Sequence, residues 1–307
     1  PARLCDDERV TASTTPNDPL PSAEDVRDQI ETWISLYWSD EVTVADWWAE
    51  MARAGYSSPT LPVTAGGLGW PGDLAATVMA AFNRAKVLGP PGGLGLLLAA
   101  PTIAHHGSAE QVLQYVGPIL DGTAGWCQLF SEPQAGSDLA GLQTKAERDG
   151  DEWIITGQKV WTSTAQTADL AMLIARTDPG APKHRGITYF VIEMDQPGIE
   201  VRPLREMTGR SVFNEVFLDG ARVPHANIVG GLNDGWRIAN ATLGFERAGA
   251  GHGGATFSAA LPGTQAGDLA RPAAGFVGAK APIVGAAIGR RHLHALSELV
   301  EQSGRGD

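Results

Sequence analysis

The sequence contains only two cysteines, Cys5 and Cys127, among 307 residues. They lie far apart in the chain, and Cys127 belongs to an apolar segment. This usage is typical of a protein from a reducing compartment and not of a small disulfide-stabilised fold. We therefore expect no disulfide between them.

Basic side chains are also few, with 23 Lys and Arg against 35 Asp and Glu, which gives a net charge of −12. A strongly acidic chain is repelled by phosphate backbones and anionic lipid headgroups. We therefore expect neither nucleic acid nor a membrane as a partner. Any phosphate-bearing ligand would need a local basic patch.

Long apolar runs are absent as well, because no stretch reaches the roughly 18 residues that a membrane-spanning helix needs. The N-terminus carries no basic segment followed by an apolar one, so it does not resemble an export signal. These absences predict a soluble, cytoplasmic protein. A length of 307 residues suits two domains or one large one.

Residues 1–21 form a polar arm, which we expect to be mobile. Helical periodicity dominates the chain from there to residue 124. Ser22–Asp25 matches a capping box, the usual start of a helix. Apolar residues then recur at helical spacing in 26–37, 44–51 and 74–85. Residues 22–124 are accordingly predicted to form an N-terminal helical domain.

Glycine and proline predict where these helices end. Gly55 would stop the second helix, and Gly89-Pro90 would stop the third. The apolar run Leu94–Ala104 is interrupted by Pro101, which predicts a buried, kinked helix. Ser108–Gln111 would cap a further short helix.

Near Trp126 the pattern of apolar residues changes from helical spacing to short apolar runs separated by turns. Asp149-Gly150 is a strong hairpin signal, and Gly157-Gln158 predicts a second turn, into a strand over 159–162. Further strands are expected at 170–176, 187–192, 199–203 and 215–218. Such spacing predicts a small barrel or sandwich over 125–231.

Helical signals resume after Pro224 with Asn233-Asp-Gly and an apolar stripe up to Glu246-Arg247. Residues 248–282, rich in Gly, Ala and Pro, are expected to form a long loop. One final helix is predicted over 283–302. The G-x-G-x-x-G match inside the loop follows a helix and not a strand, so it does not predict a nucleotide-binding turn.

The most informative stretch is Trp126–Asp138, an apolar strand that runs into a turn of small and acidic residues. The end of such a strand exposes backbone N–H groups and a hydroxyl, which can hold an electron-rich ring. The alternative is a hairpin loop without a ligand.

His105 and His106 are adjacent and would point about 100° apart on a helix, so no metal site is expected.

Several blocks downstream favour the ligand-binding alternative, and together with the turn they resemble the acyl-CoA dehydrogenase family. The blocks are Phe130-Ser-Glu-Pro133, Gly157-Gln-Lys-Val-Trp161-Thr-Ser163, Gly186-Ile-Thr-Tyr-Phe190, Pro197-Gly-Ile199, Gly209-Arg-Ser211, Asn214-Glu-Val-Phe217 and Glu246-Arg247. Their order and spacing match the family from Phe130 to Arg247, and more weakly from about residue 26 onward. The resemblance implies an α+β fold with an N-terminal helical domain, a middle β-barrel and an incomplete C-terminal helical domain, residues 232–307.

The resemblance also implies FAD as cofactor. A cofactor is needed because side chains cannot accept a hydride, whereas a flavin can. The cofactor positions of the family fall on Gln128, Phe130, Ser131, Gly136, Ser137, Trp161, Thr162 and Ser163. Ser131 and Ser163 replace usual threonines and keep the hydroxyl, whereas Gln128 departs from an aromatic found in some relatives. The alternatives are a packed aromatic for Trp161 and a turn hydroxyl for Ser163.

For the substrate, the resemblance implies an acyl-CoA that meets the cofactor near Ser137. Glu246 matches one of the family's positions for the base that removes the α proton, and Arg247 matches an arginine near the substrate. We expect partial desolvation to raise the pKa of Glu246, as a general base requires. The alternative is a surface Glu-Arg pair.

The reaction implied is FAD-dependent α,β-dehydrogenation of an acyl-CoA to the trans-2-enoyl-CoA, with an electron-transfer flavoprotein as acceptor. Pro182-Lys-His184 and Phe213–Phe217 resemble actinobacterial members that act on branched or sterol-derived acyl groups. The family normally continues through further helices. A non-catalytic or heteromeric partner subunit, or a fragment, therefore remains the alternative, and we expect a homo- or hetero-oligomer.

Overall fold

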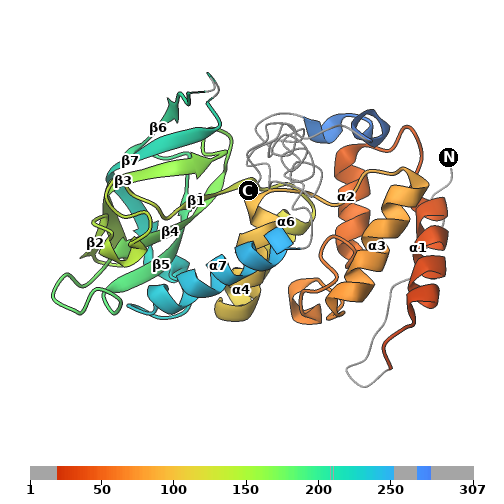
Figure 1. Cartoon of the computed structure of the whole chain (residues 1–307), viewed down its shortest axis with the longest axis horizontal. Helices are drawn as coiled ribbons and strands as arrows, with labels where there is room; N and C mark the ends of the chain where they lie inside the picture. Colours follow the sequence, from red (N-terminus) through yellow and green to blue (C-terminus); the bar gives the residue numbers. More distant parts are fainter. Residues whose placement is uncertain (1–18, 208, 210, 252–267, 278–307) are drawn as a thin grey trace, which may run out of the picture.

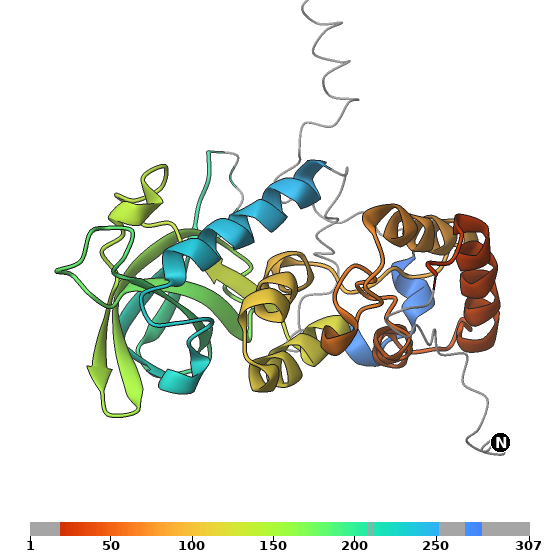
Figure 2. The same cartoon turned by 90° about the horizontal axis from the view of Figure 1, so that it is seen from below.

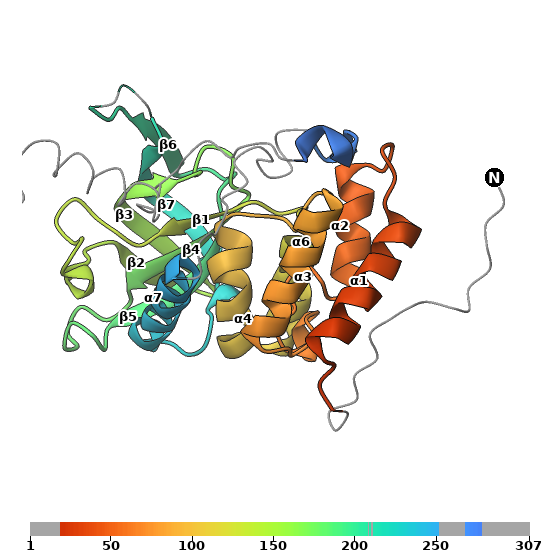
Figure 3. The ribbon, with the colours of Figure 1, turned by 45° about the vertical axis from the view of Figure 1, so that its right-hand side comes forward.

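The computed structural model describes residues 19–207, 209, 211–251 and 268–277, and these form a group of helices beside a curved β-sheet (Figure 1). Helices α1 to α3 lie farthest from the sheet. Helices α4 and α6 lie between them and the sheet, and α7 passes along the sheet (Figures 1 and 3). The arm and Cys5 fall outside the described residues, except for the arm's last three residues. The predicted final helix also falls outside them.

The three predicted N-terminal helices are confirmed as α1 (Ala23–Tyr37), α2 (Val44–Arg53) and α3 (Gly72–Ala85). The capping box of α1 is present: Asp25 N–H donates to Ser22 Oγ, and Ser22 N–H donates to the Asp25 carboxylate. The predicted end of α3 at Gly89-Pro90 is wrong. The helix ends at Ala85 because Lys86 adopts a left-handed conformation, with φ of 54°.

Tryptophan side chains form the core of this helical group, as predicted. Trp33 and Trp47 are buried with ring centroids 4.8 Å apart, and Phe82 packs against both. The indole N–H groups of Trp47 and Trp48 donate to the carbonyl oxygens of Leu88 and Gly89. A buried indole with its N–H satisfied is a stable core element and needs no ligand to explain it.

The segment around Pro101 is helical, as predicted, but its irregularity lies upstream of the proline. A π-helical turn, η2 (Gly95–Ala99), leads directly into α4 (Ala100–His106). Pro101 has no N–H to donate to the preceding turn, and a wide turn is one way to accommodate this loss. The 3-10 turn η1 (Val63–Ala65), helix α5 (Ala109–Gln111), the π-helical turn η3 (Val112–Val116) and helix α6 (Gly117–Leu120) complete this part.

A seven-stranded sheet forms the second half of the structure. Its strands are β1 (Trp126–Leu129), β2 (Lys145–Asp149), β3 (Glu152–Ser163), β4 (Leu170–Arg176), β5 (Ile187–Glu193), β6 (Ile199–Leu204) and β7 (Phe213–Pro224). The order is β1-β4-β2-β3-β7-β6, with β5 also paired to β4. The sheet is therefore a half-barrel, and the α+β architecture is confirmed.

One predicted turn in the sheet is wrong, because Gly157-Gln158 lies inside β3, which runs unbroken from Glu152 to Ser163. Gly157 instead permits a close approach. A Cβ there would lie 2.4 Å from Thr144 Oγ1 and 2.7 Å from Thr144 Cα. Glycine is required because another chain segment passes against the strand.

Helix α7 (Gly235–Gly251) follows the 3-10 turn η5 (His225–Asn227) and lies against both the sheet and α4 (Figure 2). Thr242 is buried where they meet. Its Oγ1 lies 2.9 Å from Thr102 Oγ1 of α4 and donates to Tyr189 of β5 at 3.4 Å. This polar contact fixes the helix that carries Glu246.

The predicted loop 248–282 is helical at its start, because α7 continues to Gly251, and contains two short 3-10 turns, η7 (Asp268–Ala270) and η8 (Ala273–Phe276). Thr43 forms a β-bridge with Pro272, and Val44 N–H donates to Arg271 O. Residues 268–277 thus return to the N-terminal helices (Figure 1). Within the described residues, no helix has both the length and the hydropathy to cross a bilayer.

Candidate functional site

The segment after β1 forms a tight turn and then a loop that rejoins the sheet at β2. Glu132 and Ala135 exchange backbone hydrogen bonds of 3.2 and 3.1 Å. Phe130 is buried against Tyr189, with ring centroids 5.8 Å apart, whereas Gly136 and Ser137 are exposed. The turn therefore presents small residues to solvent on a fixed base. We refer to residues 131–144 as the site loop.

The site loop lies directly beside β3, as a hydrogen bond of 2.9 Å from Val160 N–H to Ser131 O shows. Trp161 follows at a point where the pairing of β3 with β7 changes register. Its side chain is 60% exposed, and its backbone is left-handed, with φ of 60°. A bulky residue rarely adopts this conformation, and such outliers concentrate at functional sites.

Trp161 contacts the edge of Phe213, with ring centroids 5.8 Å apart and planes at 86°. With this contact in place, Trp161 is still 60% exposed. The alternative of a packed barrel aromatic therefore does not describe Trp161. Ser163 is half-buried at the end of β3.

Two of the expected cofactor residues have buried polar atoms without a partner. Gln128 Nε2 and Thr162 Oγ1 make no hydrogen bond to any residue in the described part of the chain. Leaving such groups unsatisfied costs about 1–3 kcal/mol each. Free polar groups on Gln128 and on Thr162, which directly follows the exposed Trp161, suit the polar edge of a flavin, and the exposed indole suits its flat face. The residues present are therefore compatible with FAD.

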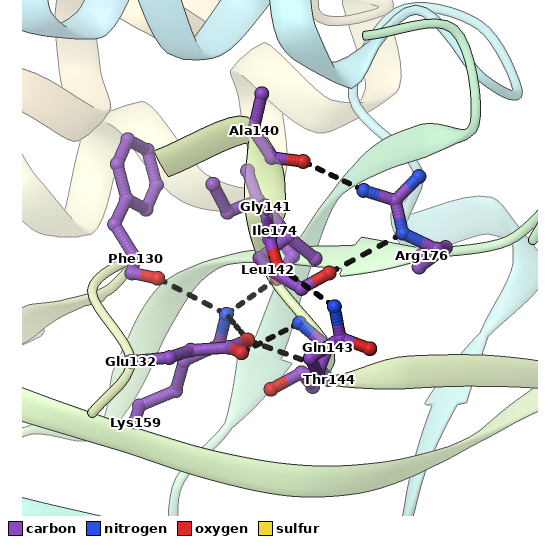
Figure 4. A network of polar contacts seen from close by, with 10 residues as sticks. All are labelled: Phe130, Glu132, Ala140, Gly141, Leu142, Gln143, Thr144, Lys159, Ile174 and Arg176. Atoms are coloured by element: carbon purple, nitrogen blue, oxygen red, sulfur yellow. Dashed lines mark hydrogen bonds and ion pairs between the residues drawn. The ribbon is translucent and has the colours of Figure 1, made fainter. Parts of the chain in front are cut away.

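A buried ion pair that sequence reasoning missed holds the site loop (Figure 4). Lys159 is fully buried, and its Nζ donates to Phe130 O at 3.1 Å, Glu132 Oε1 at 2.9 Å and Ile174 O at 2.9 Å. Glu132 in turn accepts from Gln143 N–H at 2.6 Å and Thr144 N–H at 2.9 Å. The only sequence signal was a charged residue in an apolar strand.

The environment of this pair alters both pKa values. Burial alone would raise the pKa of Glu132, but the Lys159 ammonium and the hydrogen bonds from the loop outweigh it. The pKa of this carboxyl therefore lies below its ordinary value. Burial lowers the pKa of Lys159, and Glu132 offsets part of that effect.

Arg176 of β4 holds the far side of the site loop (Figure 4). Its guanidinium donates to Ala140 O at 2.8 Å and to Leu142 O at 3.3 Å. It also donates to Lys183 O, and the Lys183 ammonium pairs with Asp138 at 2.8 Å. Lys183 of the basic segment 183–185 therefore lies against Asp138, the residue that follows Ser137 in the exposed part of the loop.

Glu246 and Arg247 lie near the end of α7, and both are exposed. The partial desolvation expected for Glu246 is therefore not seen. No hydrogen bond or ion pair links Glu246 to the site loop in the described residues. The two adjacent histidines, for which no metal site was expected, bond within the protein. His105 bonds to Pro101 O, and His106 bonds to the guanidinium of Arg237.

Comparison with known families agrees with this geometry. Residues 23–123 match the model "Acyl-CoA dehydrogenase, N-terminal domain", and residues 127–220 match "Acyl-CoA dehydrogenase, middle domain". The helical group and the half-barrel, which carries the site loop, thus define an acyl-CoA dehydrogenase fold. The chain belongs to the acyl-CoA dehydrogenase family.

Among curated proteins, acyl-CoA dehydrogenase FadE34 of Mycobacterium tuberculosis is 60% identical over 149 residues, which are 48% of this chain and 21% of that protein. The chain spans about half the length of the other curated relatives it matches.

Two solved structures share the fold. The Tcur3481-Tcur3483 steroid ACAD has a TM-score of 0.59 and 29% identity over 74% of this chain and 62% of that one. The ChsE4-ChsE5 complex from M. tuberculosis has a TM-score of 0.58 and 30% identity over 77% of this chain and 61% of that one.

Proposed function

We propose that this chain carries the flavin and acyl-CoA sites of an enzyme that dehydrogenates acyl-CoA thioesters between the α and β carbons. The observation that carries the proposal is the exposed Trp161 in a left-handed conformation beside the site loop. Packing against the described residues does not account for this side chain, and a flat aromatic ligand would. FAD, when bound, supplies the hydride acceptor that side chains cannot provide.

The residues around Trp161 have distinct roles in this proposal. The indole covers one face of the ring. Ser131, Thr162 and Ser163 offer hydroxyls, and Gln128 offers its unpaired amide N–H. Such donors stabilise negative charge on the polar side of a reduced flavin. Phe130 and Gly136 shape the strand end and the turn.

The acyl-CoA substrate would lie between the site loop and α7. Ser137 is exposed, and the segment 183–185, which carries Lys183 and Arg185, reaches the neighbouring Asp138 through the Lys183–Asp138 ion pair. That basic patch suits the phosphates of CoA. The steroid ACAD with a similar fold supports a sterol-derived acyl group.

Glu246 is the proposed base for the α proton, with Arg247 near the substrate. The carboxylate is exposed in this chain, so a general base of suitable pKa requires the substrate to cover it. Thr242, one turn earlier on α7, is fixed by Thr102 and Tyr189. The helix therefore holds Glu246 at a defined position relative to the sheet. Electrons would pass on to an electron-transfer flavoprotein.

A second candidate is a partner subunit of a heteromeric dehydrogenase, which is favoured by the similarity to the ChsE4-ChsE5 complex. In that arrangement another chain would complete the cofactor site. The same would hold if this chain is part of a longer protein, since it spans about half of most matched relatives. Both cases predict weak binding of FAD by this chain alone, and the heteromeric case also predicts an oligomer.

The test is a titration of the full chain with FAD, followed by anaerobic addition of an acyl-CoA. Loss of flavin absorbance on adding the thioester is expected if the chain is catalytic. FAD binding without bleaching would favour the partner-subunit candidate. A chain that binds no FAD, alone or with a heteromeric partner, would refute both.

The role of Glu246 is tested in the same assay. Glu246→Gln keeps the shape and removes the basicity, so the bleaching rate should fall about 100-fold or more. Glu110→Gln, on another exposed helical position, serves as the control. An unimpaired rate in Glu246→Gln would place the base elsewhere.

A further inference from the structure

Lys159 is the most deeply buried charge in the described part of the chain, and its contacts are complete. An ammonium has three donors, and here all three are used, on Phe130 O, Glu132 Oε1 and Ile174 O. These acceptors belong to the end of β1, the site loop and β4. One charge therefore ties three chain segments together.

Glu132 extends this connection to the other end of the site loop. Its two oxygens accept from the backbone N–H groups of Gln143 and Thr144, eleven and twelve residues further on. Because these donors are backbone groups, the carboxylate fixes the position of the main chain at Gln143 and Thr144. The loop is closed at its base by a single carboxylate.

Two of the residues that the proposed function places against the flavin, Ser131 and Trp161, lie next to this pair in the sequence. Ser131 lies between Phe130 and Glu132, both of which contact Lys159, and its carbonyl binds Val160 N–H. Trp161 follows Lys159 by two residues, across the register shift in β3. Their separation is thus set through Lys159.

Stability alone is a weak reason for such a pair. Replacing a buried ion pair by apolar residues of similar size is often neutral or stabilising, because both charges lose their hydration. What an ion pair provides over apolar packing is a defined geometry for each hydrogen-bonding partner. The partners here are main-chain atoms of the site loop.

We propose that Lys159 and Glu132 are positioning residues for the cofactor: they hold Ser131 and Trp161 in the relative geometry that receives the flavin ring. This inference rests on the FAD-binding function proposed above. It assigns a role to two residues that would touch neither the flavin nor the substrate.

The test compares the full chain with the double variant Lys159→Met/Glu132→Gln, which removes both charges together. The control is Arg222→Gln/Glu152→Gln, which removes an exposed ion pair at the opposite end of β3. Far-UV circular dichroism verifies folding. Lys159→Gln/Glu132→Gln, which also removes both charges but keeps a polar group at each position, replaces the double variant if that variant does not fold.

The first measurement needs no cofactor. Hydrogen exchange at the amides of Gln143, Thr144 and Val160 should accelerate in the double variant and stay unchanged in the control. Equal exchange in the variant and the wild type would overturn the positioning role.

The second measurement is the Kd for FAD and the absorbance spectrum of the flavin at saturation. We expect the Kd to rise about tenfold, as is typical when a partner behind the contacting residues is lost. The saturated spectrum should also shift, which a merely less stable protein would not show. Wild-type affinity and spectrum in the variant would overturn this inference alone. Absence of FAD binding by the wild type would overturn the proposed function and this inference with it.

Discussion

At the level of single residues, Trp161 and Glu132 both lie in environments unusual for their residue types. Trp161 is exposed and held in a left-handed conformation. Such a conformation costs about 1–3 kcal/mol and persists only where the surroundings enforce it. Glu132 is nearly hidden from solvent, and its partners keep it ionised.

For Trp161 we predict that Trp161→Ala weakens FAD binding about tenfold, because an aromatic face contact contributes roughly 0.5–1.5 kcal/mol beyond its area. Alanine keeps the same backbone strain, so folding should change little. Quenching of flavin fluorescence measures the affinity. Leu113→Ala, which removes another exposed apolar side chain on the helical side, is the control. Unchanged affinity in Trp161→Ala would end the stacking role.

For Glu132 we predict an acid-dependent loss of stability. Its pKa is lowered in the folded state, so its stabilising effect is complete above the unfolded pKa of about 4.3 and is lost as the pH falls toward the folded pKa. Glu132→Gln lacks this effect. The gap in unfolding free energy between wild type and variant should therefore shrink below roughly pH 4, by up to about 1.4 kcal/mol per pH unit.

Urea unfolding followed by circular dichroism at pH 7, 5 and 3.5 measures that gap. At neutral pH the variant should be less stable by about 3 kcal/mol, because Lys159 loses its buried counter-ion. A gap that stays constant down to pH 3.5 would contradict the lowered pKa.

At the level of elements, local signals predicted most helices and strands, and the turn wrongly predicted at Gly157 lies where a distant segment intervenes. The capping box at Ser22 and the hairpin at Asp149-Gly150 depend on neighbours within a few residues, and both are present. Gly157 was predicted to form a turn because glycine is common in turns, but glycine also occurs where two chain segments approach closely. Its actual use is contact with Thr144, on a different strand connection.

This assignment predicts that Gly157→Ala destabilises the protein by about 2 kcal/mol, the usual cost of forcing an extra carbon into a packed position. The added Cβ would push β3 away from Thr144, whose N–H binds Glu132. Thermal unfolding measures the loss. Gly72→Ala, at the open start of α3, should be neutral or slightly stabilising. If Gly157→Ala were equally harmless, the close approach would not exist.

At the level of the whole molecule, residues 268–277 join the end of the described chain to its beginning. Ala273 and Phe276 are buried in the same cluster as Trp47 and Trp48, and Ala273 N–H donates to Val42 O. The N-terminal helical group therefore depends on residues more than 200 positions away. Helix α7 makes a similar connection between the sheet and α4.

We predict that Phe276→Ala lowers the free energy of unfolding by about 3 kcal/mol, because a large side chain is removed from a packed core. The change should also increase hydrogen exchange in α2. Leu36→Ala, on the exposed face of α1, should stay within about 0.5 kcal/mol of the wild type. Wild-type stability in Phe276→Ala would show that residues 268–277 contact the helices without stabilising them.

The sequence by itself determined the helical and strand segments, most of their caps, and the family, because periodicity, capping and motif spacing are local properties of the chain. It also predicted the strand and turn over Trp126–Asp138, while the cofactor roles of Ser131, Gly136 and Ser137 in that turn stay predictions. Only the tertiary structure decided that Lys159 pairs with Glu132, that Trp161 is exposed and strained, and that Glu246 is open to solvent. Those properties depend on which distant segments meet, and on how much water they exclude, and no local pattern encodes either.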